Sequence, residues 1–377
     1  MELLMNEGKI LQLLNDFVAC EEFCNLSCDY CLAEGANLKE KHQFNRIDGK
    51  LNYSKDYKGL VYSDGYKIKE KIDETLKTYR EKFNAPILKL SGGEIMLIRN
   101  LEELIERESQ YYECVQLLTN GLLLNKQNIA RLATVKNLNV QLSMDGHTLE
   151  MNQCRLKSET LNEKLLQNLD MLINNNIVTE IYCVLSKVNI EKFDIFLDYI
   201  MSNYGNKIHV IPFPVRFLGA KKYFPEQDQL KSLKKVIYNF DKYSEVLPPL
   251  KYINEMISFI ENGFRQSQCS VPKIMSQIFD DGIITPCPNC WTVQIGNINS
   301  SFDTVTENMH NHRIYELMTA KKPRAPFCTQ CFTDYHLFNL YFNNELTLEE
   351  IAQNRPLLQG KRVQERLELL KLFSSKE

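Results

Sequence analysis

The sequence has no long apolar run. None of its 377 residues lies in an uninterrupted apolar stretch of about 18 residues, which a membrane-spanning helix would need. The first residues, MELLMNEGKILQLLNDF, carry acidic side chains and lack the basic and apolar segments of a secretory signal. Neither sign of charge dominates, because 45 Lys and Arg stand against 48 Asp and Glu, and no basic stripe is evident. We therefore expect a cytoplasmic protein with no membrane or nucleic-acid partner.

Cysteine, in contrast, is abundant. The chain has 12 cysteines, and a reducing compartment disfavours disulfides, so metal ligation is the leading explanation for most of them. Cys114 and Cys183 lie in apolar segments and are expected to be small core residues. Cys20 and Cys154 could lie near an active face. The remaining thiols form two groups, one of Cys24, Cys28 and Cys31 and one of Cys269, Cys287, Cys290, Cys328 and Cys331.

Short apolar runs alternate with amphipathic segments, a pattern typical of parallel strands joined by helices. The length allows more than one core, and internal repeats and low-complexity segments are absent. We predict an α/β fold with a partial (β/α)6 TIM-type barrel over 1–225, a helical linker over 226–260, a smaller cysteine-bearing domain over 261–335 and terminal helices over 336–377. The predicted strands are 10–19, 86–94, 114–121, 138–146, 180–186 and 207–215.

Polar motifs follow the first four predicted strands. They are the first cysteine group, SGGE, TNG and SMDG, in that order. Because parallel barrels place their active sites at the carboxyl ends of the strands, we expect these motifs to lie together. Residues 36–70 form a polar insertion that we interpret as a surface loop or lid.

The first cysteine group has the spacing C-x3-C-x2-C within the segment CNLSCDYC. Three thiolates can hold three irons of a [4Fe-4S] cluster, which leaves the fourth iron open for a ligand that is not protein. A zinc knuckle or a purely structural cluster is the alternative interpretation of the triplet alone.

This spacing after a first strand resembles the radical S-adenosylmethionine (SAM) superfamily. The resemblance implies that the open iron binds SAM, and that reductive cleavage gives a 5'-deoxyadenosyl radical that abstracts hydrogen. It also implies a [4Fe-4S] cluster on Cys24, Cys28 and Cys31, and contacts to SAM from seven residues. These are Tyr30 beside the last cysteine, Gly92, Gly93 and Glu94 for the amino group, Ser143 for the ribose or carboxylate, Arg155 for the carboxylate, and Phe213 in IPFPV near the adenine.

The second cysteine group contains a candidate hairpin. Cys269 and Cys287 flank a segment that turns at Gly282, and Cys328 and Cys331 form a C-x2-C pair. Four thiolates of this kind suit zinc or a [4Fe-4S] cluster equally well. The pattern resembles the twitch domain, the shortened SPASM domain of radical SAM enzymes, which implies one auxiliary [4Fe-4S] cluster on these four cysteines. Cys290 is unassigned: it replaces one of the four, ligates an additional site, or is a free thiol.

An auxiliary cluster beside a substrate radical suits a net oxidation. The resemblance implies modification of a ribosomally made peptide by cross-linking or oxidation, with a small-molecule dehydrogenase acting on an aminocyclitol or sugar alcohol as the alternative. A non-catalytic metal-binding redox sensor is a remote third. Flavodoxin or ferredoxin is the expected electron donor.

Two expectations concern the rest of the site. The 23 residues before Cys24 leave no room for a leader-recognition domain, so a maturase would hold its peptide with the barrel, the insertion or a partner. Asp145 and His147 are candidate bases.

Overall fold

The chain folds around one sheet of parallel strands. The computed structural model describes residues 4–19, 24–31, 65–216, 220–291, 293–299 and 302–374. Six parallel strands follow one another in sequence order through the sheet. They are β3 (Leu14–Ala19), β5 (Ile87–Gly92), β6 (Cys114–Thr119), β7 (Leu138–Ser143), β8 (Val178–Leu185) and β9 (Ile208–Pro214). The predicted partial barrel is confirmed.

The first predicted strand is divided in two. Residues 9–19 form β2 (Lys9–Leu11) and then β3, and β2 lies in a separate three-stranded sheet with β1 (Met5–Asn6) and β4 (Phe83–Asn84). In the chain, β2 comes directly before β3 and β4 comes directly before β5. The small sheet shares no ladder with the barrel strands.

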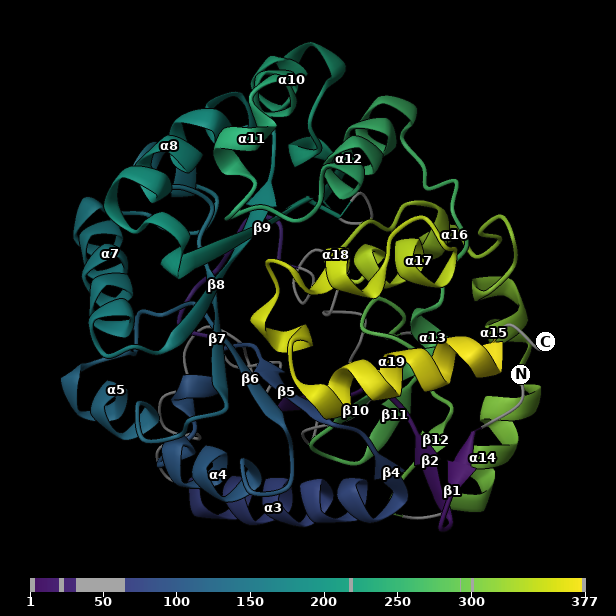
Figure 1. Ribbon diagram of the computed structural model, residues 1–377. Helices are drawn as coiled ribbons and strands as arrows, with labels where there is room; N and C mark the ends of the chain where they lie inside the picture. Colours follow the sequence, from purple (N-terminus) through teal and green to yellow (C-terminus); the bar gives the residue numbers. More distant parts are fainter. Residues whose placement is uncertain are drawn as a thin grey trace.

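Amphipathic helices cover the outside of the parallel strands (Figure 1). Their ends follow local signals: Asn125 forms a capping box with Asn128 at the start of one helix, and Ser158 caps another. The helix after Ser158 stops at Asn174, and Asn176 then takes a left-handed conformation at φ 56°. The crossover helices are α3 (Gly65–Lys82), α4 (Leu101–Glu108), α5 (Lys126–Leu132), α6 (Leu149–Asn152), α7 (Glu159–Asn174) and α8 (Phe193–Asn203).

The sheet continues beyond β3 into the C-terminal part of the chain. Strand β10 (Met275–Phe279) pairs parallel with β3, and β11 (Ile283–Thr285) and β12 (Gly296–Asn297) extend the sheet antiparallel. The turn between β10 and β11 contains Gly282 at φ 86°, where a Cβ would lie 2.5 Å from Asn299. The predicted hairpin is therefore present, and it shares the barrel's sheet.

The last helices cover the open side of the barrel, at the side of the sheet where both termini lie (Figure 1). Arg355 pairs with Glu180 of β8 at 3.0 Å, and the Tyr182 hydroxyl donates to Asp334 at 3.0 Å. These polar contacts fix the C-terminal segment against the inner face of the sheet. The remaining helices are α10 (Lys231–Tyr238), α11 (Phe240–Tyr243), α12 (Leu250–Asn262), α13 (Val271–Ile274), α14 (Phe302–Asn311), α15 (Arg313–Met318), α16 (Pro326–Thr329), α17 (His336–Phe342), α18 (Leu348–Ala352) and α19 (Lys361–Ser374).

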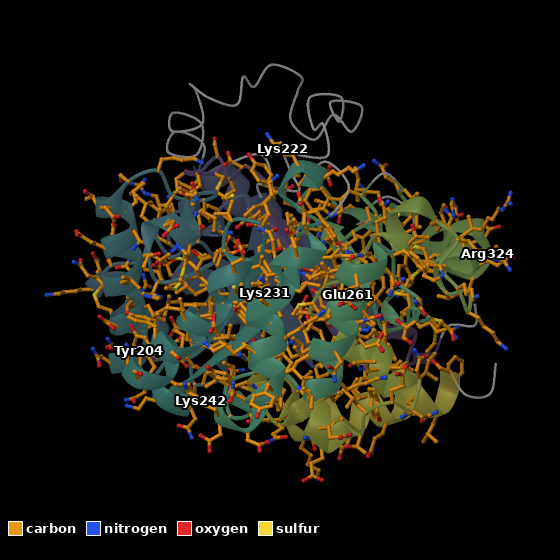
Figure 2. The ribbon with its side chains drawn as sticks, turned by 90° about the horizontal axis from the view of Figure 1, so that it is seen from above. Tyr204, Lys222, Lys231, Lys242, Glu261 and Arg324 are labelled. Atoms are coloured by element: carbon orange, nitrogen blue, oxygen red, sulfur yellow. The ribbon has the colours of Figure 1, made fainter. Side chains whose placement is uncertain are left out.

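Charges of both signs cover the outer helices. Lys231, Lys242 and Glu261 extend from α10, α11 and α12 (Figure 2). No helix among the described residues is long and apolar enough to span a bilayer. The division of the chain at residues 225, 260 and 335 stays a prediction. The insertion expected at 36–70 lies outside the described residues up to residue 64, and its last residues, from Gly65, belong to helix α3 and not to a loop.

Candidate functional site

The first cysteine group lies beyond the carboxyl end of β3. Its loop makes a turn in which the Cys31 N–H donates to the Cys28 carbonyl at 3.0 Å, and the Leu26 N–H points at the Cys24 sulfur at 3.4 Å. Burial raises the pKa of the Cys24 thiol to about 12. All three thiols are half-buried and face one pocket.

This pocket of about 210 Å³ lies at the carboxyl ends of the barrel strands. The structure brings together there every residue that the sequence predicts for the first site. They are Cys24, Cys28, Tyr30, Cys31, Gly92, Gly93, Glu94, Ser143, Arg155 and Phe213. Their individual contacts with a ligand stay predictions.

Glu94 ties two strand ends together. Its carboxylate accepts hydrogen bonds from Thr119 Oγ1 at 2.7 Å, from the Asn120 N–H at 2.8 Å and from the Met96 N–H at 3.0 Å. Burial raises the pKa of Glu94, and these donors oppose that rise. A carboxylate has about four acceptor positions, so one position remains for a group inside the pocket.

Asn120 joins the cysteine loop to the barrel. Its side-chain amide donates to Asn25 at 2.7 Å, next to Cys24, while its backbone N–H binds Glu94. The TNG motif marked this position without assigning it a role. Packing requires a glycine at position 92, because a Cβ there would lie 1.9 Å from the Ala19 carbonyl oxygen.

A buried polar network closes the other side of the pocket. The Tyr30 hydroxyl donates to Asp145, and Arg155 Nη1 donates to the Tyr30 oxygen at 3.1 Å. Asp145 also accepts from the Val184 N–H at 2.9 Å. Burial alone would lower the pKa of Arg155, but Tyr30, Cys28 and Asp145 raise it. Arg155 is therefore a fixed cation beside the thiols.

The two candidate bases lie outside the open pocket. Asp145 is engaged with Tyr30 and Val184 and does not line the pocket. His147 stacks on Tyr199 with ring centroids 4.3 Å apart, and it too lies away from the pocket. Burial lowers the pKa of His147.

Sequence reasoning missed Arg216, which follows β9 and lines the same pocket. One of its guanidinium nitrogens is buried with no hydrogen-bond partner. It also lies close enough to Cys331 and Asp16 to affect the electrostatics of both. No motif marks this residue, and its position becomes visible only in the folded chain.

The second cysteine group converges in the C-terminal part of the chain. The electrostatic neighbours of Cys287 are Cys290, Cys331, Cys269 and Cys328. The pKa of the Cys287 thiol is raised, mainly because the group is buried and also because these thiols lie near it. The hairpin supplies Cys287, while helix α16 and the turn after it supply the C-x2-C pair. The four predicted auxiliary ligands and Cys290 therefore share one region.

Hydrogen-bond donors surround this second group of thiols. Asn289 Nδ2 lies 3.0 Å from the Cys331 sulfur, and the guanidinium group of Arg265 is an electrostatic neighbour of Cys269. The buried Tyr315 hydroxyl has no hydrogen-bond partner among the described residues, and Cys287 and Cys290 are its electrostatic neighbours. Iron-sulfur clusters are held by cysteine thiolates, and hydrogen bonds to the sulfur atoms help to set their reduction potentials.

The second group does not have the arrangement of a site for a single ion. Among the residues that the structure describes, no three His, Cys, Asp or Glu side chains are placed to hold one metal ion. A [4Fe-4S] cluster takes one thiolate on each of four irons. The four predicted auxiliary ligands match that number.

The other cysteines follow their sequence context only in part. Cys183 is fully buried in β8, and Cys114 is half-buried at the start of β6. Cys154 is buried and does not line the pocket. Cys20 lies outside the described residues.

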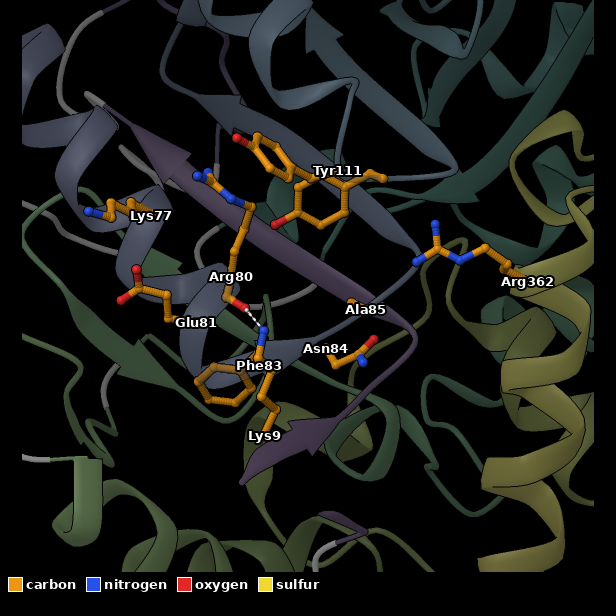
Figure 3. A pocket seen from close by; sticks show the side chains of 10 residues that line it. Lys9, Lys77, Arg80, Glu81, Phe83, Asn84, Ala85, Tyr111 and Arg362 are labelled. Carbon is orange, nitrogen blue, oxygen red and sulfur yellow. Dashed lines mark hydrogen bonds between the residues drawn. The ribbon is translucent and has the colours of Figure 1, made fainter. Parts of the chain in front are cut away.

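A larger pocket of about 470 Å³ lies at the opposite, amino ends of the strands (Figure 3). Arg80 borders it, paired with Glu108 at 2.6 Å and lying 4.2 Å over the Tyr111 ring. Lys9 donates to the Arg80 carbonyl at 3.2 Å. None of the predicted site residues lines this pocket, so size alone does not locate the thiols.

Comparison with known proteins shows what the barrel is similar to. The sequence model described as Radical SAM superfamily matches residues 21–200. The mycofactocin maturase MftC of Mycobacterium ulcerans is 27% identical over 129 residues, which are 34% of this chain and 28% of that protein. A GTP 3',8-cyclase of Staphylococcus epidermidis is 26% identical over 345 residues, which are 90% of this chain and 92% of that one.

Solved structures share the fold. The structure of native anSMEcpe with bound AdoMet and Cp18Cys peptide superposes with a TM-score of 0.57. Its sequence is 16% identical, and the match covers 96% of this chain and 99% of that one. At this identity the likeness establishes the architecture, including the C-terminal part of the chain.

Proposed function

We propose that this chain, which belongs to the radical SAM superfamily by its residues 21–200, oxidises a peptide substrate in the pocket at the carboxyl ends of its barrel strands. The observation that carries the proposal is the convergence of three thiols with Glu94 and Arg155 in one pocket. A cluster bound there supplies the electron that cleaves SAM, and the resulting 5'-deoxyadenosyl radical takes a hydrogen atom from the substrate.

The residues of the pocket have separate tasks. Cys24, Cys28 and Cys31 would hold the cluster and leave one iron open. The remaining acceptor position of Glu94 suits the ammonium group of SAM, and Arg155 suits its carboxylate. The polar network of Tyr30 and Asp145 keeps Arg155 in place beside the thiols. These pairings place opposite charges together at a buried carboxylate and a half-buried guanidinium.

The second group of thiols would hold the group that accepts the second electron of the oxidation. Loss of a hydrogen atom leaves a substrate radical, which must give up one more electron and a proton, or form a bond, to reach a stable product. An auxiliary [4Fe-4S] cluster on Cys269, Cys287, Cys328 and Cys331 would accept that electron. Cys290 then remains a free thiol beside Cys287.

Two kinds of substrate are supported by different relatives. The match to a maturase and the fold shared with an enzyme solved with a peptide support a peptide. The 345-residue match to a GTP 3',8-cyclase supports a small molecule, here a nucleotide, as the second candidate. An aminocyclitol or sugar alcohol is a further small-molecule alternative, and flavodoxin or ferredoxin would supply electrons.

Deuterium transfer distinguishes these substrates. The reconstituted enzyme is reduced and incubated with SAM and either peptides extracted from cells grown in heavy water or deuterated GTP. The proposal predicts deuterium in 5'-deoxyadenosine from the peptide pool alone. Transfer from GTP alone would establish the second candidate, and the Glu94→Gln enzyme, with SAM binding weakened at least tenfold, is the matched control.

A further inference from the structure

Arg265 is a buried arginine beside the second group of thiols. It follows α12, is 6% exposed, and its backbone N–H donates to the Thr329 carbonyl at 2.7 Å. Thr329 lies between Cys328 and Cys331 in sequence. The backbone of Arg265 is thus attached directly to the C-x2-C turn.

The guanidinium of Arg265 has no carboxylate partner. Among the described residues its buried Nε and Nη2 atoms have no hydrogen-bond acceptor, sulfur included, and the side chain forms no ion pair with any Asp or Glu that the structure describes. Glu255 and Glu345 line a pocket with Arg265, but both pair instead with Lys251, at 3.3 and 2.8 Å. A buried guanidinium without an anion is costly.

The nearest anions available to Arg265 are thiolates. The electrostatic neighbours of its side chain are Cys269, Cys331 and Cys328. These are three of the four proposed auxiliary ligands. Two buried guanidinium nitrogens of Arg265 are thus unpaired beside the proposed auxiliary ligands, where a negatively charged thiolate-bound group would pair with them.

We propose that Arg265 is the counter-ion of the auxiliary cluster and raises its reduction potential, so that the cluster accepts the electron of the substrate radical. The inference rests on the proposed function, because it needs a cluster on the second group of thiols. A positive charge and N–H bonds to sulfur stabilise the reduced, more negative state of a cluster more than the oxidised state. Asn289 and Arg216 act on Cys331 in the same direction.

The test measures the potential of the auxiliary cluster without any substrate. Cys24, Cys28 and Cys31 are changed to alanine, so that the auxiliary cluster gives the only signal, and that protein is titrated with dithionite under electron paramagnetic resonance. Adding Arg265→Gln should raise the ratio of oxidised to reduced cluster at least tenfold at a fixed applied potential. This corresponds to a fall of 59 mV in the reduction potential of a one-electron couple. Arg265→Lys keeps the charge and loses the planar fork, so it should shift the potential less and in the same direction.

Matched removal of a surface charge is the control. Arg324 extends outward from the protein (Figure 2), and Arg324→Gln should leave the potential unchanged. An unchanged potential in Arg265→Gln overturns the inference and leaves the proposed function standing. If Arg265→Gln does not load iron, Arg265→Lys is measured in its place, and an unchanged reduction potential in that variant overturns the inference. A parent protein that binds no iron at the second site would instead defeat the auxiliary-cluster part of the proposed function.

Discussion

Asp16 is a carboxyl group buried on the inner face of β3. Burial raises its pKa from 3.8 to about 6, against the opposing effects of Lys89 and Gln277. A folded pKa above the unfolded value means that stability is greatest when the group is protonated and falls as the pH rises through about 6. The loss approaches about 3 kcal/mol at higher pH.

Asp16→Asn should remove this loss while keeping an acceptor for Gln277. The free energy of unfolding of the variant, relative to wild type, should increase between pH 5 and pH 8, as measured by urea denaturation of the metal-free protein. Asp228 is exposed, and Asp228→Asn is the control: its free energy of unfolding should match that of wild type at both pH 5 and pH 8. A relative stability that does not increase with pH would show that Asp16 is not held in this way.

Tyr30 is a hydrogen-bond partner of a second buried carboxylate, that of Asp145. Tyr30→Phe removes the hydroxyl that donates to Asp145 and accepts from Arg155. The loss should cost about 1 to 3 kcal/mol, because a buried acceptor is left short of a donor. Chemical denaturation measures this loss. Tyr204→Phe breaks a bond to Asp170 at 2.7 Å on the exposed surface, and an equal effect there would contradict the argument.

At the scale of elements, the C-terminal segment is held in the barrel by a buried ion pair. Arg355 bonds Glu180 at 3.0 Å, and Gln116 also donates to Glu180 at 2.9 Å. Arg355→Met leaves a buried carboxylate unpaired and should cost about 3 to 5 kcal/mol. Changing both partners, Glu180→Gln with Arg355→Met, should cost less than Arg355→Met alone.

A double-mutant cycle on the metal-free protein measures this coupling. The exposed pair Lys361 and Glu365 is the control and should couple by about 0.3 to 0.5 kcal/mol. Additive effects of the Glu180 and Arg355 changes would mean that the C-terminal segment is held by its apolar contacts alone.

Across the whole molecule, the sequence predicts what local patterns encode. Six strands, their crossover helices and the hairpin at Gly282 follow from periodicity and turn residues. The convergence of ten site residues follows from the rule that parallel strands present their carboxyl ends together.

Other features depend on distant contacts and could not be predicted. The pairing of β10 with β3 joins residues about 260 positions apart, and no local signal specifies it. Arg216, Arg265 and Arg355 look in the sequence like ordinary solvated arginines. Only the fold shows that each is held among buried polar groups, two of them beside the second cysteine group.

The central claim, two clusters of which the first serves SAM, is tested most directly by iron and sulfide content after anaerobic reconstitution. Wild type is compared with the variant in which Cys24, Cys28 and Cys31 are alanine, and both are then reduced with SAM. We predict about eight irons falling to about four, with 5'-deoxyadenosine released by wild type alone. Zinc in place of iron, or no cleavage of SAM by the reduced wild type, would contradict the account.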